Sequence, residues 1–137
     1  MSSTTHNPVE LGELVRKAEE IVEDCFGQGG HGAGGSTGRT QLSNAIDAIN
    51  QSRGSIEVFL NWLRYQMARE EFWRRRGRST GKMLGELIAK YAEELQKRDP
   101  DHADQHLTHF LGFMRRALIA LNYLDQIPAQ VKEASTR

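Results

Sequence analysis

Apolar residues recur every three or four positions through most of this chain, which is the spacing of one face of an α-helix. The stripes are separated by polar or glycine-rich breaks and fall within residues 7–26, 40–53, 55–78, 80–98 and 103–127. No stretch shows the strict alternation of a half-buried strand. The sequence therefore predicts an all-α fold, a compact bundle of five helices in a single helical domain over residues 1–137.

Capping residues set the expected starts of the first and fourth helices. Asn7, Pro8 and Glu10 supply an N-cap, a proline in the first turn and an acid three residues beyond the cap, so the first helix is predicted to begin at Asn7. Ser79 or Thr80 is the expected N-cap of the fourth helix, directly after the basic end of the third.

Seven of the twelve residues from 27 to 38 are glycine. That composition is typical of a flexible tether, and the segment lacks the preceding strand and the following lysine of a phosphate-binding loop. We therefore expect a flexible glycine-rich loop over 27–38 between the first helix and a four-helix core over 39–127, followed by a polar tail over 128–137.

The stretch 55–78 combines an apolar pattern and a basic run in one predicted helix, with Ser55 as its expected N-cap. Its first half is apolar on nearly all sides, which predicts the central helix of the bundle with Trp62 and Tyr65 in the core. Its second half ends in four arginines, Arg74, Arg75, Arg76 and Arg78. One helix would then carry both core packing and a strongly basic end.

Charge is distributed unevenly along a chain with no net charge. The 137 residues contain 18 lysines and arginines and 18 acids. Residues 1–35 carry 2 basic and 6 acidic side chains, residues 36–98 carry 12 and 7, and residues 99–137 carry 4 and 5. A basic middle segment between acidic ends predicts a localised positive surface for an anionic partner.

The rest of the composition narrows the class of protein. Cys25 is the only cysteine, which excludes an internal disulfide and a cysteine-based zinc finger and favours a reducing compartment. The sequence has neither an 18-residue apolar run nor an apolar segment of signal-peptide type at its start. We therefore expect a cytoplasmic protein with no membrane partner.

The basic residues of segment 39–82 are the candidate binding site. Nine cations oppose four acids there, and eight of the nine are arginine, whose planar fork suits phosphate groups. The candidate RNA-binding residues are Arg39, Arg53, Arg64, Arg69, Arg74, Arg75, Arg76, Arg78 and Lys82. Aromatic residues interleave with them, as on surfaces that stack single-stranded bases, and the lack of a DNA-recognition motif favours RNA over duplex DNA. The alternative is that the aromatics are core and the arginines solvate the end of a helix.

Catalytic residues are not predicted. Serines and threonines fall at caps and in loops, Cys25 lies on an apolar stripe, and the acids are scattered over helix surfaces, so we predict a non-enzymatic protein without metal or cofactor. His102, His106 and His109 share one helix at a spacing that can bring imidazoles to one metal ion. A simpler explanation is that these histidines lie on the solvent-exposed side of the helix and bind no metal. A small metal-dependent enzyme is the open alternative.

Three stretches resemble the small helical subunit of type III-A (Csm) CRISPR effector complexes. Residues 40–42 (TQL) open a helix as the family's threonine–glutamine–aliphatic motif does. Residues 63–69 (LRYQMAR) resemble the family's leucine-rich helix with its tyrosine and closing alanine–arginine pair. Residues 110–114 (FLGFM) and 120–123 (ALNY) resemble its last helix, so the resemblance spans about residues 39–125.

The resemblance implies a non-catalytic structural subunit that stacks with copies of itself along the effector filament and binds the guide–target duplex through its backbone. Its partners would be CRISPR RNA, target RNA, and the backbone and large subunits. Arg69 matches the alanine–arginine position and is the strongest single candidate, whereas Ser43 and Asn44 stand where the family often has a basic residue. Two further interpretations stay open: the small subunit of the sister Cmr (type III-B) complex, and a helical adaptor that homodimerises through its third and fifth helices without nucleic acid.

Overall fold

The computed structural model describes residues 8–27 and 35–124, and this part of the chain is all-α. Its elements are α1 (Leu11–Phe26), α2 (Gly35–Gln51), α3 (Ile56–Arg69), α4 (Glu71–Arg74), α5 (Leu84–Arg98) and α6 (Ala103–Leu124). Between the described residues, β pairing is confined to one isolated bridge that joins Arg76 and Met83. The all-α prediction is confirmed, with six helices in the described residues where five were expected for the chain.

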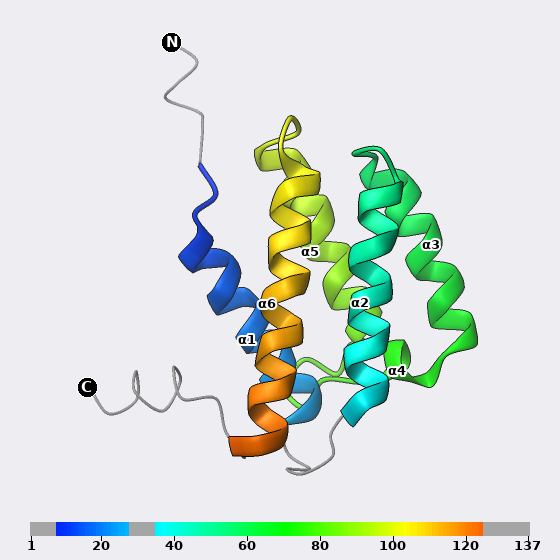
Figure 1. Cartoon of the computed structure of the whole chain (residues 1–137), viewed down its shortest axis with the longest axis vertical. Coiled ribbons are helices and arrows are strands. Elements are labelled where there is room, and N and C mark those ends of the chain that lie inside the picture. Colours follow the sequence, from blue (N-terminus) through cyan, green and yellow to red (C-terminus); the bar gives the residue numbers. More distant parts are fainter. Residues whose placement is uncertain (1–7, 28–34, 125–137) are drawn as a thin grey trace.

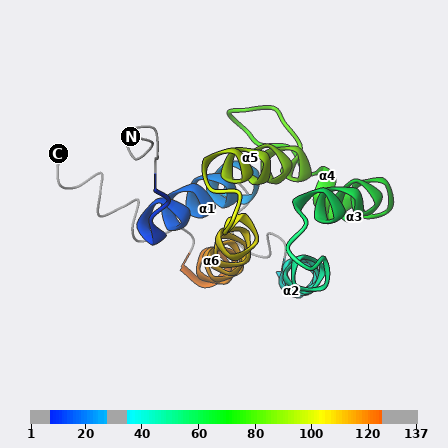
Figure 2. The same ribbon diagram turned by 90° about the horizontal axis from the view of Figure 1, so that it is seen from above.

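The helices form two layers (Figures 1 and 2). One layer holds α1, α5 and α3, and the other holds α6 and α2. The longest helix, α6, packs against α1, α2 and α5. Its buried face consists of Ala103, Leu107, Phe110, Leu111, Met114, Ala117, Leu118 and Leu121. The central element is therefore α6, and the prediction that the third helix is central was wrong, because α3 lies at one edge of the molecule (Figure 2).

The predicted helix over 55–78 is broken at Glu70, whose backbone is extended (φ −119°, ψ 127°). The chain turns there into the short α4, which buries Trp73 completely. It also places the Phe72 ring 5.5 Å from the Phe26 ring of α1, measured between centroids. Packing of these aromatic rings against the core is the physical reason for the break, and it removes the basic residues after Arg74 from any helix.

The apolar stripes predict the buried faces well, with one large exception. Every buried residue of α1 except Phe26 lies on the apolar stripe that the sequence predicts for the first helix. That stripe consists of Leu11, Leu14, Val15, Ala18, Ile21, Val22 and Cys25. Trp62 is half-buried and packs against the core, as expected. Tyr65, however, is 58% exposed, because its side of α3 has no helix packed over it once α3 is an edge helix.

The first two helices, α1 and α2, begin at residues other than those predicted. α1 starts at Leu11, and the carbonyl of Pro8 accepts a hydrogen bond from Arg98 Nη2 (2.8 Å) outside the helix. α2 starts at Gly35, inside the segment expected to be a loop. Gly38 allows this helix to pack closely, because a Cβ at that position would lie 2.5 Å from Leu118 Cδ2 on α6.

Several predictions concern positions outside the described residues. They are the N-cap at Asn7, residues 28–34 of the glycine-rich loop predicted over 27–38, the end of the last helix at 125–127 and the tail over 128–137. Within the described ranges, no helix combines the length and apolar character that crossing a bilayer requires.

Candidate nucleic-acid interface

Residues 75–83, here called the 75–83 loop, connect α4 to α5 in a hairpin-like path. The Gly77 N–H donates to the Lys82 carbonyl (2.8 Å), and the Leu84 N–H donates to the Arg75 carbonyl (2.7 Å). Gly81 occupies the left-handed region at φ 71°, which closes the turn and favours glycine. The loop contains four cations and no acid, so a basic sequence is held in a defined path.

Asp24 at the end of α1 fastens the 75–83 loop to the helical body. Its carboxylate accepts hydrogen bonds from the Ser79 N–H (2.7 Å), the Ser79 hydroxyl (2.9 Å) and the Thr80 hydroxyl (2.8 Å). Burial alone would raise the pKa of Asp24, but these hydrogen bonds outweigh it and hold the pKa below its usual value. Ser79 and Thr80 therefore do not cap the fourth predicted helix; α5 begins at Leu84, where the Glu86 carboxylate accepts from the Met83 N–H (2.9 Å).

Two arginines of the basic run bind the carboxyl ends of helices. Arg74 Nη1 donates to the carbonyls of Met67 (2.7 Å) and Ala68 (3.2 Å) in the last turn of α3. Arg75 Nε donates to the carbonyl of Cys25 (2.6 Å) at the end of α1. The unpaired carbonyls there carry partial negative charge, which cations stabilise. The arginine run thus has internal partners, and its density alone is not evidence for an external anion.

Arg69 lies against the exposed ring of Tyr65 one turn earlier on α3. Arg69 Nη1 donates to the Tyr65 hydroxyl (3.5 Å), and the guanidinium carbon lies 5.3 Å from the ring centroid. Arg69 Nη2 also lies 3.9 Å from Glu70 Oε2, with the two side chains 53% and 37% exposed. An exposed aromatic ring beside an arginine is the kind of surface on which nucleic-acid bases stack. The sequence interpretation missed Tyr65 because it placed this helix at the centre.

The remaining cations of this region point into solvent. Arg76 Nη1 donates to the Gly81 carbonyl within the 75–83 loop (2.8 Å). Arg64, Arg78 and Lys82 are exposed, and their side chains pair with no group in the described part of the chain. The 75–83 loop therefore presents Arg76, Arg78 and Lys82 outward from a fixed backbone.

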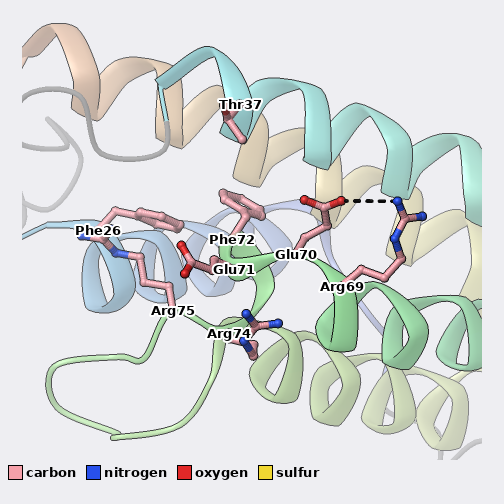
Figure 3. Close-up of a pocket in the computed structure, with 8 residues that line it drawn as sticks. All are labelled: Phe26, Thr37, Arg69, Glu70, Glu71, Phe72, Arg74 and Arg75. Carbon is pink, nitrogen blue, oxygen red and sulfur yellow. Dashed lines mark ion pairs between the residues drawn. The ribbon is translucent and has the colours of Figure 1, made fainter.

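An open depression of about 870 Å³ lies beside this loop (Figure 3). Its lining residues are Phe26, Thr37, Arg69, Glu70, Glu71, Phe72, Arg74 and Arg75. Figure 3 shows the two phenylalanine rings side by side, with Arg75 next to Phe26, and the guanidinium carbon of Arg75 lies 4.9 Å from the Phe26 ring centroid. Two glutamates offset two of its three arginines, so the depression is less suited to a polyanion than the 75–83 loop.

The other predicted site residues lie elsewhere. Arg53 sits in the turn between α2 and α3, at a positive φ of 58° and at the far end of α3 from α4 (Figure 1). The 14 residues of α3 put it about 20 Å from Arg69. Arg39 lies on α2 in a shallow groove shared with Arg115 of α6, a residue that was not predicted. The structure thus gathers the candidates from Arg69 to Lys82 at one end and separates Arg53 from them.

The three predicted histidines do not meet at one point: His102 lies just before α6, and His106 and His109 lie on it. Asp99 lies between two of them: Oδ1 is 3.1 Å from His102 Nδ1, and Oδ2 is 2.9 Å from His106 Nε2. His109 instead stacks near Phe113. Among the residues described, no group of three histidine, cysteine or acidic side chains is arranged to hold a metal ion. Asp99 thus contacts both His102, just before α6, and His106 in its first turns, and the sequence interpretation missed these contacts.

The cysteine lies in the core. Cys25 is fully buried and unpaired, and burial raises the pKa of its thiol to about 12. A thiol with so high a pKa is a poor nucleophile at neutral pH.

Comparison with known proteins adds no constraint to this picture. The chain matches no protein-family model, no curated protein and no solved structure.

Proposed function

We propose that this chain is a non-catalytic, RNA-backbone-binding subunit of a type III CRISPR RNA-guided effector complex. The observation that carries RNA binding is the 75–83 loop, a basic segment that Asp24 holds in place and that directs Arg76, Arg78 and Lys82 into solvent. A basic loop on a fixed backbone loses little conformational freedom when it meets a polyanion.

Binding without sequence specificity follows from the chemistry of these groups. Guanidinium and ammonium groups bind phosphate oxygens, which are the same at every nucleotide, so they position a strand without reading its bases. Arg75 can also bind phosphate, although its Nε donates to the Cys25 carbonyl, because its terminal N–H groups are left for an external acceptor. Tyr65 adds an exposed ring on which any base can stack.

The type III assignment comes from the sequence resemblance, with Arg69 at the family's alanine–arginine position. Its partners are CRISPR RNA, target RNA, the backbone and large subunits, and copies of itself stacked along the filament. Type III-A is the subtype that the resemblance favours, and the small subunit of the Cmr complex is the alternative.

The test is RNA binding by the purified chain. Binding is measured by fluorescence anisotropy at low salt with two unrelated single-stranded RNAs of equal length. We expect equal affinities for the two RNAs and a loss of roughly threefold to tenfold in Arg78→Gln, which removes an exposed cation of the 75–83 loop. Arg53→Gln removes the same charge from the turn between α2 and α3 and is the matched control, with an expected affinity close to that of the wild type. Equal losses in the two variants would contradict a localised RNA site.

An adaptor without nucleic acid is the second candidate, favoured by one observation. Val58 and Tyr65 are 54% and 58% exposed, and because they stand seven residues apart they lie on the same face of α3. If α3 forms a homodimer, sedimentation should show a dimer that Val58→Asp dissociates, with no RNA binding at any salt concentration. A monomer that binds RNA would exclude this candidate.

A further inference from the structure

A shallow groove of about 270 Å³ between α2 and α6 is lined almost entirely by hydrogen-bond donors. Its lining residues are Arg39, Thr40, Ser43, Asn44 and Arg115. The two helices lie side by side (Figures 1 and 2). Together α2 and α6 form one layer of the molecule. The 75–83 loop lies on the outer side of the other layer, next to α5 (Figure 2). The groove holds two guanidinium groups, two hydroxyls and an amide, and no carboxylate.

The two arginines of this groove lack the acids that helix surfaces normally provide. No acid lies three or four residues before or after Arg39 or Arg115, the positions where an ion-pair partner on the same helix would stand. Residues 105–124 contain no acid at all, and Asp47 is the only acid of α2. Asp47 is eight residues from Arg39, about 12 Å along the helix. Within the described residues, the two cations therefore share the groove with no carboxylate in its lining and no ion pair to either guanidinium.

Arg115 carries the clearest sign of a missing acceptor. Its side chain is partly buried, and its Nε is shielded from solvent with no hydrogen-bond partner in the described residues. A buried donor without an acceptor is unfavourable. The neighbouring Arg116 differs, because it is exposed and its guanidinium lies over the Phe113 ring at 5.7 Å.

We infer that this groove binds a phosphate oxyanion, with Arg39 and Arg115 as its charged ligands. Oxygens of one phosphate can accept from both guanidinium forks, and a turn of the Arg115 fork toward the anion gives its Nε–H the acceptor that it lacks. Thr40, Ser43 and Asn44 supply neutral donors to the remaining oxygens. The phosphate can belong to a nucleic-acid backbone or be a free phosphate. Only the backbone source rests on the proposed RNA-binding function.

The first experiment uses inorganic phosphate and the folded full-length chain. We expect phosphate to shift the Arg115 Nε–H resonance in a proton–nitrogen NMR titration, and to raise the melting temperature above that in chloride of the same ionic strength. Because phosphate also stabilises proteins by exclusion from their surfaces, the comparison that counts is between variants. Arg39→Gln and Arg115→Gln should lose the extra stabilisation, whereas Arg116→Gln, one residue away, should keep it.

The second experiment separates the two sources of phosphate with a short uridine oligonucleotide. If the backbone is the ligand, the oligonucleotide should shift the Arg115 resonance at a concentration roughly tenfold or more below that of inorganic phosphate, since several phosphates are then engaged. Equal concentrations would indicate a site for free phosphate. If Arg115→Gln does not fold, Arg39→Gln on the exposed face of α2 and the wild-type titration carry the test.

The inference is overturned if neither probe moves the Arg115 resonance, or if Arg116→Gln changes phosphate binding as much as Arg39→Gln does. Failure of RNA binding at the 75–83 loop is a separate result, because variants of that loop leave both arginines of the groove intact.

Discussion

Replacement of Asp24 by alanine should destabilise the protein far more than a surface acid normally does. The variant loses three hydrogen bonds to a carboxylate, two from Ser79 and one from Thr80. A hydrogen bond to a charged group contributes about 1.5–3 kcal/mol, and water competes at this partly exposed site, so about 1 kcal/mol each is the appropriate scale. We therefore expect Asp24→Ala to lower the free energy of unfolding by about 2–3 kcal/mol.

The assay is urea denaturation followed by circular dichroism. With a slope of about 1.5–2 kcal/mol/M for a chain of this size, the midpoint should fall by roughly 1–2 M. Glu20→Ala is the matched control on the same helix. The Glu20 side chain is 71% exposed, and its ion pair with Lys17 Nζ is long, at 3.8 Å. This control should change stability by less than about 0.5 kcal/mol. In the Asp24→Ala background, Thr80→Val should cost much less than in the wild type, since its partner is already gone.

The pH dependence of this difference has a definite sign. The native pKa of Asp24 lies below its unfolded value, because the hydrogen bonds outweigh burial. Its contribution is therefore complete above the unfolded pKa and is lost as the pH falls through the native pKa. A difference between wild type and Asp24→Ala that is no larger at neutral pH than that of Glu20→Ala would refute the role of Asp24 in holding the loop.

Three further results are expected. Arg74→Ala should lower the free energy of unfolding by about 1–2 kcal/mol although Arg74 is exposed, because its guanidinium binds the last carbonyls of α3; chemical denaturation checks this, and a loss below about 0.5 kcal/mol contradicts it. Gly38→Ala should destabilise the protein by about 1–3 kcal/mol, since its Cβ would lie 2.5 Å from a methyl carbon of Leu118. Gly112→Ala should stabilise the protein by about 0.5–1 kcal/mol, because a Cβ there has no other atom within 4 Å. The two variants should therefore shift the melting temperature in opposite directions. Hydrogen bonding and charge from Asp99 raise the pKa of His102. The contribution of His102 to stability is therefore complete below its unfolded pKa and is lost as the pH rises through its native pKa. Urea midpoints measured across that pH range should show this loss in the wild type and not in Asp99→Asn.

Local periodicity is sufficient to predict most of this fold. The stripes on α1, α5 and α6 identify buried faces, because each stripe depends only on the 3.6-residue repeat. The Ser55 N-cap is confirmed as well, with its hydroxyl accepting from the Val58 N–H at 3.1 Å. These features involve residues within one or two helical turns of each other, and a single sequence contains that information.

The features that were missed depend on contacts between distant parts of the chain. Arg75 binds the carbonyl of Cys25, fifty residues earlier, so a run of arginines that suggests an external anion has a partner inside the protein. The break at Glu70 follows from the burial of Trp73, and no local signal distinguishes that aromatic from those of a continuous helix. Arg115 is different, because the lack of any acid at helical spacing is visible in the sequence and could have identified it.

The position of the basic segment could be predicted from the sequence, but not which of its cations bind helix ends and which face solvent. Charge counting finds the cations from Arg69 to Lys82. Only the three-dimensional arrangement separates those that bind helix ends from those that face solvent. The exposed set, Arg76, Arg78 and Lys82, is the part of the original candidate site with the strongest physical case for RNA.

The most direct test of that case is the salt dependence of RNA affinity in two triple variants of equal charge. One variant replaces Arg76, Arg78 and Lys82 of the 75–83 loop with glutamine, and the other replaces the exposed cations Arg16, Lys90 and Lys97 of α1 and α5. If the loop binds phosphates, the slope of log affinity against log salt should shrink by roughly 2 in the loop variant, about 0.7 for each lost contact to a single strand. The control variant should keep nearly the wild-type slope. Equal slopes in the two variants, or a loop variant with wild-type slope and affinity, would contradict RNA-backbone binding by this loop.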